Sequence, residues 1–561
     1  MIFEQIKNYY CFVLLTILFI FSNNIAIAQP WNDKSLLSSE DSLRGFINSE
    51  REWWDILTYD ITIKPNIHSK TIMGQNKITF RTISPSTKMQ IDLQSPLKID
   101  SVLLDNGKKI SFEKNKNIWY LQIPTQMINS INTVIIFYSG EPHTAQLPPW
   151  DGGWIWEKDS LNRPWISVAC QGIGASIWFP CKDHQSDEPD NGIFMSIIVP
   201  DSLMAISNGR LIATEYNKDG TSKYIWRVLN PINNYGISFY IGNYQSITET
   251  YNGLNGNLDV TYWFIDYNFE KVKKHLLTEV NRALTCFENW FGAYPFYEDG
   301  YQIIDVPGYG MEHQSGIAYG NNYQKGNKGR DFSGTGWGMK WDFLVVHETA
   351  HEWFGNNITT YDLADKWVHE SFAAYSEVLF LNDFFSKEAG DEYTVGMKKM
   401  VKNDTPIIGK YGINMQGSSD MYSKGRYLIH MIRQIISNDD KFKKILRGLN
   451  QKYCHSIVTS NEIENYINNQ VEVNLSPIFN QYLRTIKIPV LEYFFLDTQL
   501  NYKFTNCNND FTMPVLVYVN GNKLWLTPNT QWQKINSYSF KEAIHSIEID
   551  KNFFIDIKKY N

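Results

Sequence analysis

Alternating apolar and polar residues dominate the first part of the chain after its N-terminal segment. From about residue 53 to residue 265, short runs such as 59–63 place an apolar side chain at every second position, and turn sequences such as Asp-Asn-Gly at 105–107 follow them. A period of two puts the apolar side chains on one face of a strand. This part of the chain is therefore predicted to be rich in β-strands.

The apolar period lengthens to three or four residues near Phe269, which is the spacing of one helix face. This pattern runs to Gly292, and further helical patterns cover about 341–354, 366–385 and the chain up to about 486, with one strand-like segment at 302–306. After Pro489 short alternating runs return. The pattern thus predicts a mainly helical region followed by a small β region.

These changes divide the chain into segments, and the length of 561 residues favours several domains. We predict a multidomain α+β protein with a signal peptide at 1–28, an N-terminal β-rich domain at 29–265, a mainly helical domain at 266–488 and a small C-terminal β-sandwich-like domain at 489–561.

The chain begins with the residue order of a secretory signal peptide. Lys7 precedes an apolar run at 11–21, and Ala-Ile-Ala follows at 26–28. The run of about 11 residues is shorter than the roughly 20 that a membrane-spanning helix needs. We therefore expect cleavage after Ala28, export to the periplasm or the exterior, and no stable membrane span afterwards. An uncleaved membrane anchor is the alternative.

Net charge and cysteine content limit the classes of binding partner and the expected state of the thiols. The formal net charge of -7 is spread along the sequence without a basic stripe, which argues against a nucleic-acid partner. After cleavage an odd, widely spaced set of cysteines remains: Cys170, Cys181, Cys286, Cys454 and Cys507. Buried free thiols are favoured, although one Cys170–Cys181 bridge is permitted in an oxidising compartment. The oligomeric state is not predicted.

A candidate metal site lies in the helical region. His347 and His351 are one helical turn apart and therefore project from the same face. Imidazole nitrogens suit Zn²⁺, and a catalytic zinc takes three protein ligands and leaves one position for water. Glu348 lies beside this face, where it can accept a proton from that water. Glu370, on the next predicted helix, is the candidate third ligand.

The residues around this site resemble a known family. His347-Glu348-x-x-His351, eighteen residues and then Glu370 is similar to the zinc signature of the gluzincin metallopeptidases related to aminopeptidase N and leukotriene hydrolase. Residues 351–356 (HEWFGN) resemble the family's "HxWFGN", and 367–373 (WVHESFA) resemble its "WLNEGFA". The resemblance implies one Zn²⁺ per chain, held by His347, His351 and Glu370.

Further motifs match this family in the expected order. Gln171, 179–181 (FPC) and 187–189 (DEP) resemble its "TQ…FPC…DEP" region, and 422–425 (YSKG) resembles its "YxKG". The resemblance covers about 53–486 and implies a saddle-like N-terminal β domain and a thermolysin-like catalytic domain. It also implies that Tyr422 stabilises the oxyanion, and the family's long helical C-terminal domain has no counterpart in this sequence.

The substrate-binding residues follow from a weaker match. Gly310-Met311-Glu312-His313 resembles the family's "GxMEN" loop, but Tyr309 stands where the motif has its glycine and His313 replaces its asparagine. The resemblance implies that Glu312, assisted by Gln171, binds the α-ammonium of a peptide with a free N-terminus. Gly310, Met311 and His313 are expected to lie along the substrate.

Three functions are compatible with these residues. The favoured one is a zinc aminopeptidase, in which Glu348 activates the zinc-bound water and Tyr422 stabilises the oxyanion. The alternative is a zinc endopeptidase or an epoxide-hydrolase-like enzyme with the same site. A catalytically dead binding protein is disfavoured because every ligand and the base are retained. Glu377, two turns after Glu370, either steadies a metal ligand or is a solvated helix carboxylate.

Overall fold

The computed structural model describes residues 39–496, 499–536 and 544–560. The predicted signal peptide at 1–28 lies outside the described residues. Within the described part of the chain, no helix has the length and the apolar character needed to cross a membrane.

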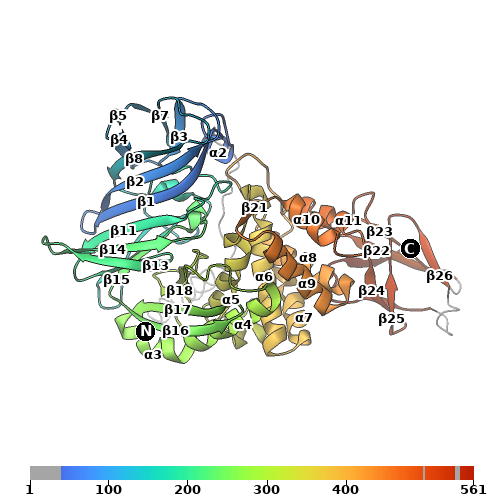
Figure 1. The fold of residues 1–561 in the computed structure, drawn as a ribbon. Coiled ribbons are helices and arrows are strands. Elements are labelled where there is room, and N and C mark those ends of the chain that lie inside the picture. Colours follow the sequence, from blue (N-terminus) through green and yellow to red (C-terminus); the bar gives the residue numbers. More distant parts are fainter. Residues whose placement is uncertain (1–38, 497–498, 537–543, 561) are drawn as a thin grey trace, which may run out of the picture. The chain divides into compact units, whose positions relative to one another are not determined.

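The N-terminal part is built from β-sheets, as the period of two predicts (Figure 1). The largest sheet has the order β13 (Arg210–Tyr216), β14 (Thr221–Val228), β11 (Ile193–Pro200), β1 (Trp54–Asn66), β2 (Thr71–Thr82), β8 (Ile131–Gly140), β4 (Lys98–Leu104) and β5 (Lys109–Ile110). In β14 buried and half-buried residues alternate strictly, so one face of the strand packs into the core. β1 pairs antiparallel with β2 and parallel with β11, where Tyr59 lies opposite Ile193.

Two smaller sheets complete this part. The first has the order β12 (Met204–Ser207), β15 (Phe239–Gly242), β10 (Pro164–Ala169) and β9 (Gly153–Lys158), and the second has the order β3 (Lys88–Asp92), β7 (Ile118–Gln122) and β6 (Phe112–Asn115). One continuous apolar core joins them to the large sheet. Gln171 lies two residues after the end of β10, so this strand positions it.

The boundary predicted after Ile265 falls inside a single sheet. This sheet has the order β16 (Tyr244–Gly253), β17 (Gly256–Ile265), β18 (Tyr301–Asp305) and β19 (Ile317–Tyr319). β17 and β18 pair in parallel, and buried side chains of β17 share their core with the helices that follow. We therefore place the boundary near Tyr244, because β17 pairs with β18 of the helical part and β16 pairs with β17.

The helical part begins with α3 (Phe269–Lys271) and α4 (Leu277–Phe291) and contains α5 (Phe343–Ala350), α6 (Trp367–Phe384), α7 (Lys387–Gly396), α8 (Asp420–Ile436), α9 (Asp439–Lys452), α10 (Ser460–Asn468) and α11 (Ser476–Arg484). Helix α6 is buried on all sides and packs against α4, α5, α7 and α8. A short parallel pair joins β20 (Ile358–Thr360) to β21 (Ser456–Val458).

Helix α5 is shorter than the predicted 341–354. Asp342 caps its start by accepting a hydrogen bond from Val345 N at 3.2 Å. The regular α-helix ends at Ala350, and the following segment breaks at Phe354, which is extended, and at Gly355, which has a φ of 129°. Glycine adopts this backbone conformation without the strain that a Cβ would cause. The turn separates α5 from β20.

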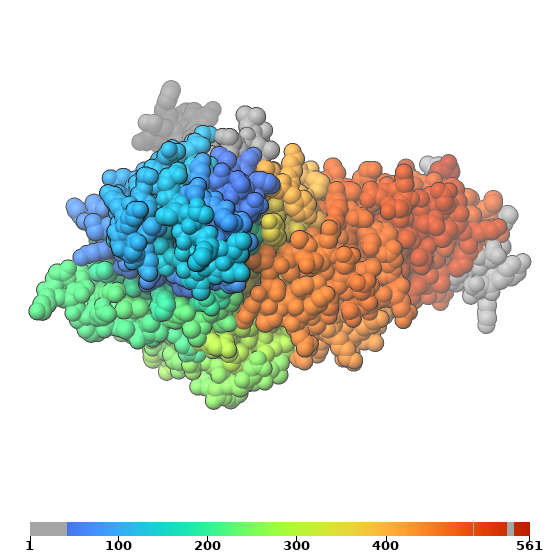
Figure 2. Space-filling view, turned by 45° about the horizontal axis from the view of Figure 1, so that its top comes forward, coloured from blue at the N-terminus to red at the C-terminus, as the bar shows by residue number. Residues whose placement is uncertain are grey.

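The C-terminal part consists of strands, as predicted. One sheet has the order β26 (Gln533–Asn536), β23 (Gln499–Thr505), β22 (Val490–Leu496) and β28 (Asp556–Lys559), and the other has the order β25 (Asn522–Leu526), β24 (Val515–Val519) and β27 (Ile547–Ile549). The helical part lies between the N-terminal sheets and these strands (Figure 1 and Figure 2). Tyr427 and Tyr482 donate hydrogen bonds to backbone oxygens of Lys551 and Phe554, both at 2.7 Å.

The described cysteines are all free. Cys170, Cys181 and Cys286 are buried, in agreement with the favoured prediction, whereas Cys454 is exposed and Cys507 is half-buried. The permitted Cys170–Cys181 bridge is therefore not formed.

Candidate metal centre

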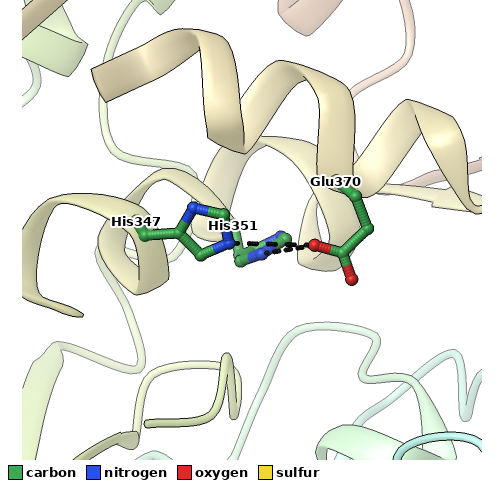
Figure 3. Close-up of side chains that lie close together, drawn as sticks. All are labelled: His347, His351 and Glu370. Atoms are coloured by element: carbon green, nitrogen blue, oxygen red, sulfur yellow. Dashed lines mark ion pairs between the residues drawn. The ribbon is translucent and has the colours of Figure 1, made fainter. Parts of the chain in front are cut away.

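His347, His351 and Glu370 come together as a compact set of ligand atoms. Both histidines lie at the C-terminal end of α5, and Glu370 lies in the first turn of α6. Glu370 Oε2 is 3.8 Å from His347 Nε2 and 3.5 Å from His351 Nε2, and one ligand atom of each residue lies within 4.8 Å of the others (Figure 3). All three side chains are buried. The residue types and spacing suit a single metal ion with an open position.

Hydrogen bonds orient both imidazole rings toward Glu370. His347 Nδ1 lies 3.0 Å from Glu377 Oε1, and His351 Nδ1 lies 3.0 Å from the carbonyl oxygen of Phe354. When Nδ1 donates in this way, Nε2 is left as the metal-binding nitrogen. The φ of 129° at Gly355 lets the chain turn back close to the His351 ring. A Cβ at residue 355 would lie 3.2 Å from His351 Nδ1.

Glu377 is a buried partner of the metal ligands and not a solvated carboxylate. Besides His347, it accepts hydrogen bonds from Arg426 Nη2 at 2.6 Å and from the Tyr393 hydroxyl at 2.7 Å. The ion pair with Arg426 is itself buried. Arg426 follows Tyr422 by four residues in the sequence, but no motif marks it or Tyr393 as part of the site.

The charge balance of these side chains fits a bound cation. Burial disfavours a charged His347, yet the carboxylates of Glu370 and Glu377 raise its pKa to about 10. The buried carboxylates thus favour positive charge at the ligand atoms. A divalent metal at the three ligand atoms would supply that charge, so the residues present fit the zinc that their pattern predicts.

Glu348 lies beside the ligands and is held close to the Gly310 loop. It is buried, and burial raises the pKa of its carboxyl to about 7. A Cβ on Gly310 would meet Glu348 Oε1 at 2.8 Å and Leu344 Cδ2 at 2.6 Å, so a larger residue here would require these two side chains to shift. The loop and the candidate base are thereby placed next to each other.

Glu312 and Gln171 are brought together from different domains. Gln171 Nε2 donates a hydrogen bond to Glu312 Oε1, and both side chains are buried. The Glu312 backbone is fixed to the metal-binding segment, because Asn356 Nδ2 donates to its carbonyl oxygen at 2.9 Å. Glu352 supports the same loop by accepting a hydrogen bond from Ser315 N at 3.0 Å. The HEWFGN segment thus positions the Glu312 loop.

The other residues of this loop have separate contacts. Met311 is buried and pairs through its backbone with Ala318 in an isolated bridge. His313 is also buried, and its Nδ1 lies 2.6 Å from the hydroxyl of Tyr240 in β15. Burial lowers the pKa of His313 to about 3, so the ring is neutral. The structure thus engages Nδ1 of His313 with Tyr240, and the contact of this residue with substrate stays a prediction.

Tyr422, in the first turn of α8, lies next to the metal ligands. Its ring stacks against His347 with centroids 6.1 Å apart. Burial and the nearby Glu370 carboxylate raise the pKa of its hydroxyl well above the ordinary value, so the group stays protonated and can donate a hydrogen bond.

A cavity adjoins the site on the side of Gln171. Its lining includes Tyr235, Lys366, His369 and Asn414. Lys366 also contacts Glu370, with Nζ 3.2 Å from Oε1. In the sequence, Lys366 stands four residues before a metal ligand, a spacing that places both on one helix face, but nothing in the motif assigns it a role.

Comparisons with known proteins agree with this architecture. The Peptidase family M1 domain matches residues 276–482, and the Peptidase M1 N-terminal domain matches residues 56–235, which together make up more than half of the chain. Endoplasmic reticulum aminopeptidase 1 of Rattus norvegicus is 22% identical over 78% of this chain and 47% of its own length. Aminopeptidase N of Lactobacillus helveticus is 23% identical over 78% of this chain and 51% of its own.

Among solved structures, an M1 zinc metallopeptidase of Deinococcus radiodurans, as a mutant bound to a Tyr-Ser-Ala substrate, is similar. It has a TM-score of 0.65 at 17% sequence identity and covers 80% of this chain and 98% of its own. At this identity the likeness shows a shared fold. The chain spans about half the length of the curated relatives named above.

Proposed function

Because the chain belongs to peptidase family M1, we propose that it is a zinc aminopeptidase that removes residues from the N-termini of peptides. The pairing of Glu312 with Gln171 carries this proposal. A buried carboxylate with an amide beside it suits the α-ammonium of a peptide, which it would bind as a charge-assisted pair. Since Gly310 of the same loop packs against Glu348, the bound amine would present the first peptide bond to the base.

The mechanism assigns one task to each side chain. Zinc, held by His347, His351 and Glu370, would supply Lewis acidity that polarises the scissile carbonyl and acidifies the attacking water. Glu348 accepts the proton of that water and passes it to the leaving amine.

Two other side chains act on the substrate. Tyr422 donates a hydrogen bond to the oxygen that becomes negative in the transition state, a contact that is stronger there than in the ground state. Glu312 holds the α-ammonium and so sets the distance from the N-terminus to the reacting bond.

We also propose that the enzyme acts after export, in the periplasm or outside the cell. Lys7, the apolar run at 11–21 and the small residues at 26–28 support this proposal. N-terminal sequencing of the protein recovered from its native host tests it. A mature chain that begins near Gln29 is expected, and recovery of the uncleaved chain would contradict it.

Peptides that differ only at the N-terminus test the aminopeptidase activity. The purified protein is incubated with a peptide whose amine is free and with the same peptide after acetylation, and the products are identified by mass spectrometry. We expect stepwise loss of single residues from the free peptide and no cleavage of the acetylated one. Equal cleavage of both at internal bonds would mean an endopeptidase with the same zinc site.

One zinc per chain is expected, and elemental analysis measures it. His351→Ala should abolish stoichiometric zinc, because one of the three ligands is lost. His369→Ala is the matched control: His369 is buried next to Glu370, but its Nε2 accepts a hydrogen bond from Thr360 N at 2.9 Å and is not a ligand. An active protein without stoichiometric zinc or another divalent metal would contradict the assignment.

Tyr422→Phe is expected to lower kcat by roughly 10²- to 10³-fold with little change in KM, the effect of losing one oxyanion donor. Tyr482→Phe is a suitable comparison and should leave kcat unchanged, because Tyr482 is buried and its hydroxyl donates to the backbone oxygen of Phe554 at 2.7 Å. Steady-state kinetics with a free peptide measures both variants. A near-wild-type kcat for Tyr422→Phe would mean that another group stabilises the oxyanion.

A further inference from the structure

Lys366 is a buried cation in contact with a metal ligand. Its side chain is 3% exposed, and its Nζ lies 3.2 Å from Glu370 Oε1. It directly precedes α6, and its carbonyl oxygen accepts the backbone N–H of Glu370 at 3.1 Å. The lysine and the ligand are therefore held together by the first turn of the helix.

This location is unfavourable for a lysine by itself. Burial removes water from the ammonium, and the N-terminus of a helix carries a partial positive charge that repels it. Both costs have to be offset by a specific partner. One such partner is Glu370 Oε1, which lies 3.2 Å from Nζ.

The two oxygens of Glu370 thus have different surroundings. Oε2 lies 3.5 Å from His351 Nε2 and belongs to the ligand set, whereas Oε1 contacts Lys366. A carboxylate can bind a metal through one oxygen or through both. An ammonium that engages Oε1 favours binding through Oε2 alone.

We propose that Lys366 is a positioning residue that restricts Glu370 to one-oxygen binding of the zinc, and so keeps a coordination position open for the substrate. The inference rests on the proposed zinc site. A catalytic zinc binds three protein ligands and water, and it can reach five-coordination in the transition state. If the second oxygen of Glu370 occupied that position, the substrate carbonyl would have to displace it.

Cobalt substitution tests the coordination directly, without relying on turnover. Metal is removed from the wild type and from Lys366→Met, each protein is reloaded with Co²⁺ alone, and visible absorption is recorded. Four-coordinate Co²⁺ absorbs more strongly than five-coordinate Co²⁺. We expect strong bands from the wild type and a loss of intensity in Lys366→Met, because Oε1 is then free to join the metal.

Two further measurements support the spectrum. Removing a nearby positive charge and adding a ligand oxygen should both tighten Co²⁺ binding, measured in competition with a chelator. Peptide hydrolysis by the zinc form should lose kcat with little change in KM. A rise in KM alone, with an unchanged Co²⁺ spectrum, would mean that Lys366 contacts substrate from the adjoining cavity, and it would overturn the proposal.

Matched variants separate this role from a general need for a buried lysine. Lys366→Arg retains a cation and should retain the strong bands. Lys182→Met removes another buried lysine, which pairs with Asp187 in the N-terminal β part, and should also leave the bands unchanged. If Lys366→Met does not fold, Lys366→Gln provides the same comparison with a neutral polar side chain.

The outcomes distinguish this inference from the proposed function. Wild-type protein that takes up no Co²⁺ would overturn the metal site and the inference together. Uptake of Co²⁺ by both proteins with identical spectra and affinities would overturn the role of Lys366 and leave the zinc aminopeptidase proposal intact.

Discussion

Glu348→Gln is expected to retain the metal and to lose roughly 10²- to 10⁴-fold in kcat, the usual contribution of a general base. The amide has nearly the shape of the carboxylate, so the close contact with Gly310 should persist. It cannot accept the proton of the attacking water or deliver it to the leaving amine. Single-turnover kinetics and elemental analysis on the same preparation measure the two effects.

A second buried carboxylate serves as the control for Glu348. Glu464 lies in α10, is buried, and pairs with Arg484 at 2.7 Å. Glu464→Gln removes a charge of the same kind, and we expect normal turnover from the folded protein. Turnover of Glu348→Gln near the wild-type rate, with zinc present, would show that another group takes the proton.

Glu312→Ala is expected to cost ~2 to 5 kcal/mol of transition-state binding for peptides with a free amine, because a desolvated charge pair loses one partner. The effect should appear in kcat/KM. The residual cleavage should also become less sensitive to acetylation of the peptide, since the anchor for the α-ammonium is gone. The ratio of kcat/KM for free and acetylated peptides is the measurement.

The exposed carboxylate Glu298 gives the comparison for this variant. Glu298→Ala should leave both values of kcat/KM unchanged, because the residue lies in the loop before β18 and is exposed. If Glu312→Ala left the preference for free amines intact, Glu312 would not be the amine anchor. The zinc hydrolase would then need another source of exopeptidase specificity.

Local sequence was sufficient to predict the ligand-bearing helix and its chemistry. Two histidines one turn apart must project from one face of any helix, and the residues between and beyond them identify the family. The β-rich N-terminal part and the C-terminal strands were also predicted, because their period of two is a local property. The length of α5 was overestimated, since the turn at Gly355 follows from a backbone conformation that the apolar pattern does not reveal.

The tertiary structure decided which side chains contact one another across the site. The contact between Gln171 and Glu312 joins residues 141 positions apart, and the one between His347 and Glu377 joins residues 30 positions apart. Tertiary packing also places β16 and β17 in one sheet with β18 and β19 of the helical part. It brings Lys366 Nζ into contact with Glu370 Oε1. Periodicity determines which face of a helix or strand is apolar. Which element packs against that face, and which polar side chains meet at its edge, depends on the tertiary packing.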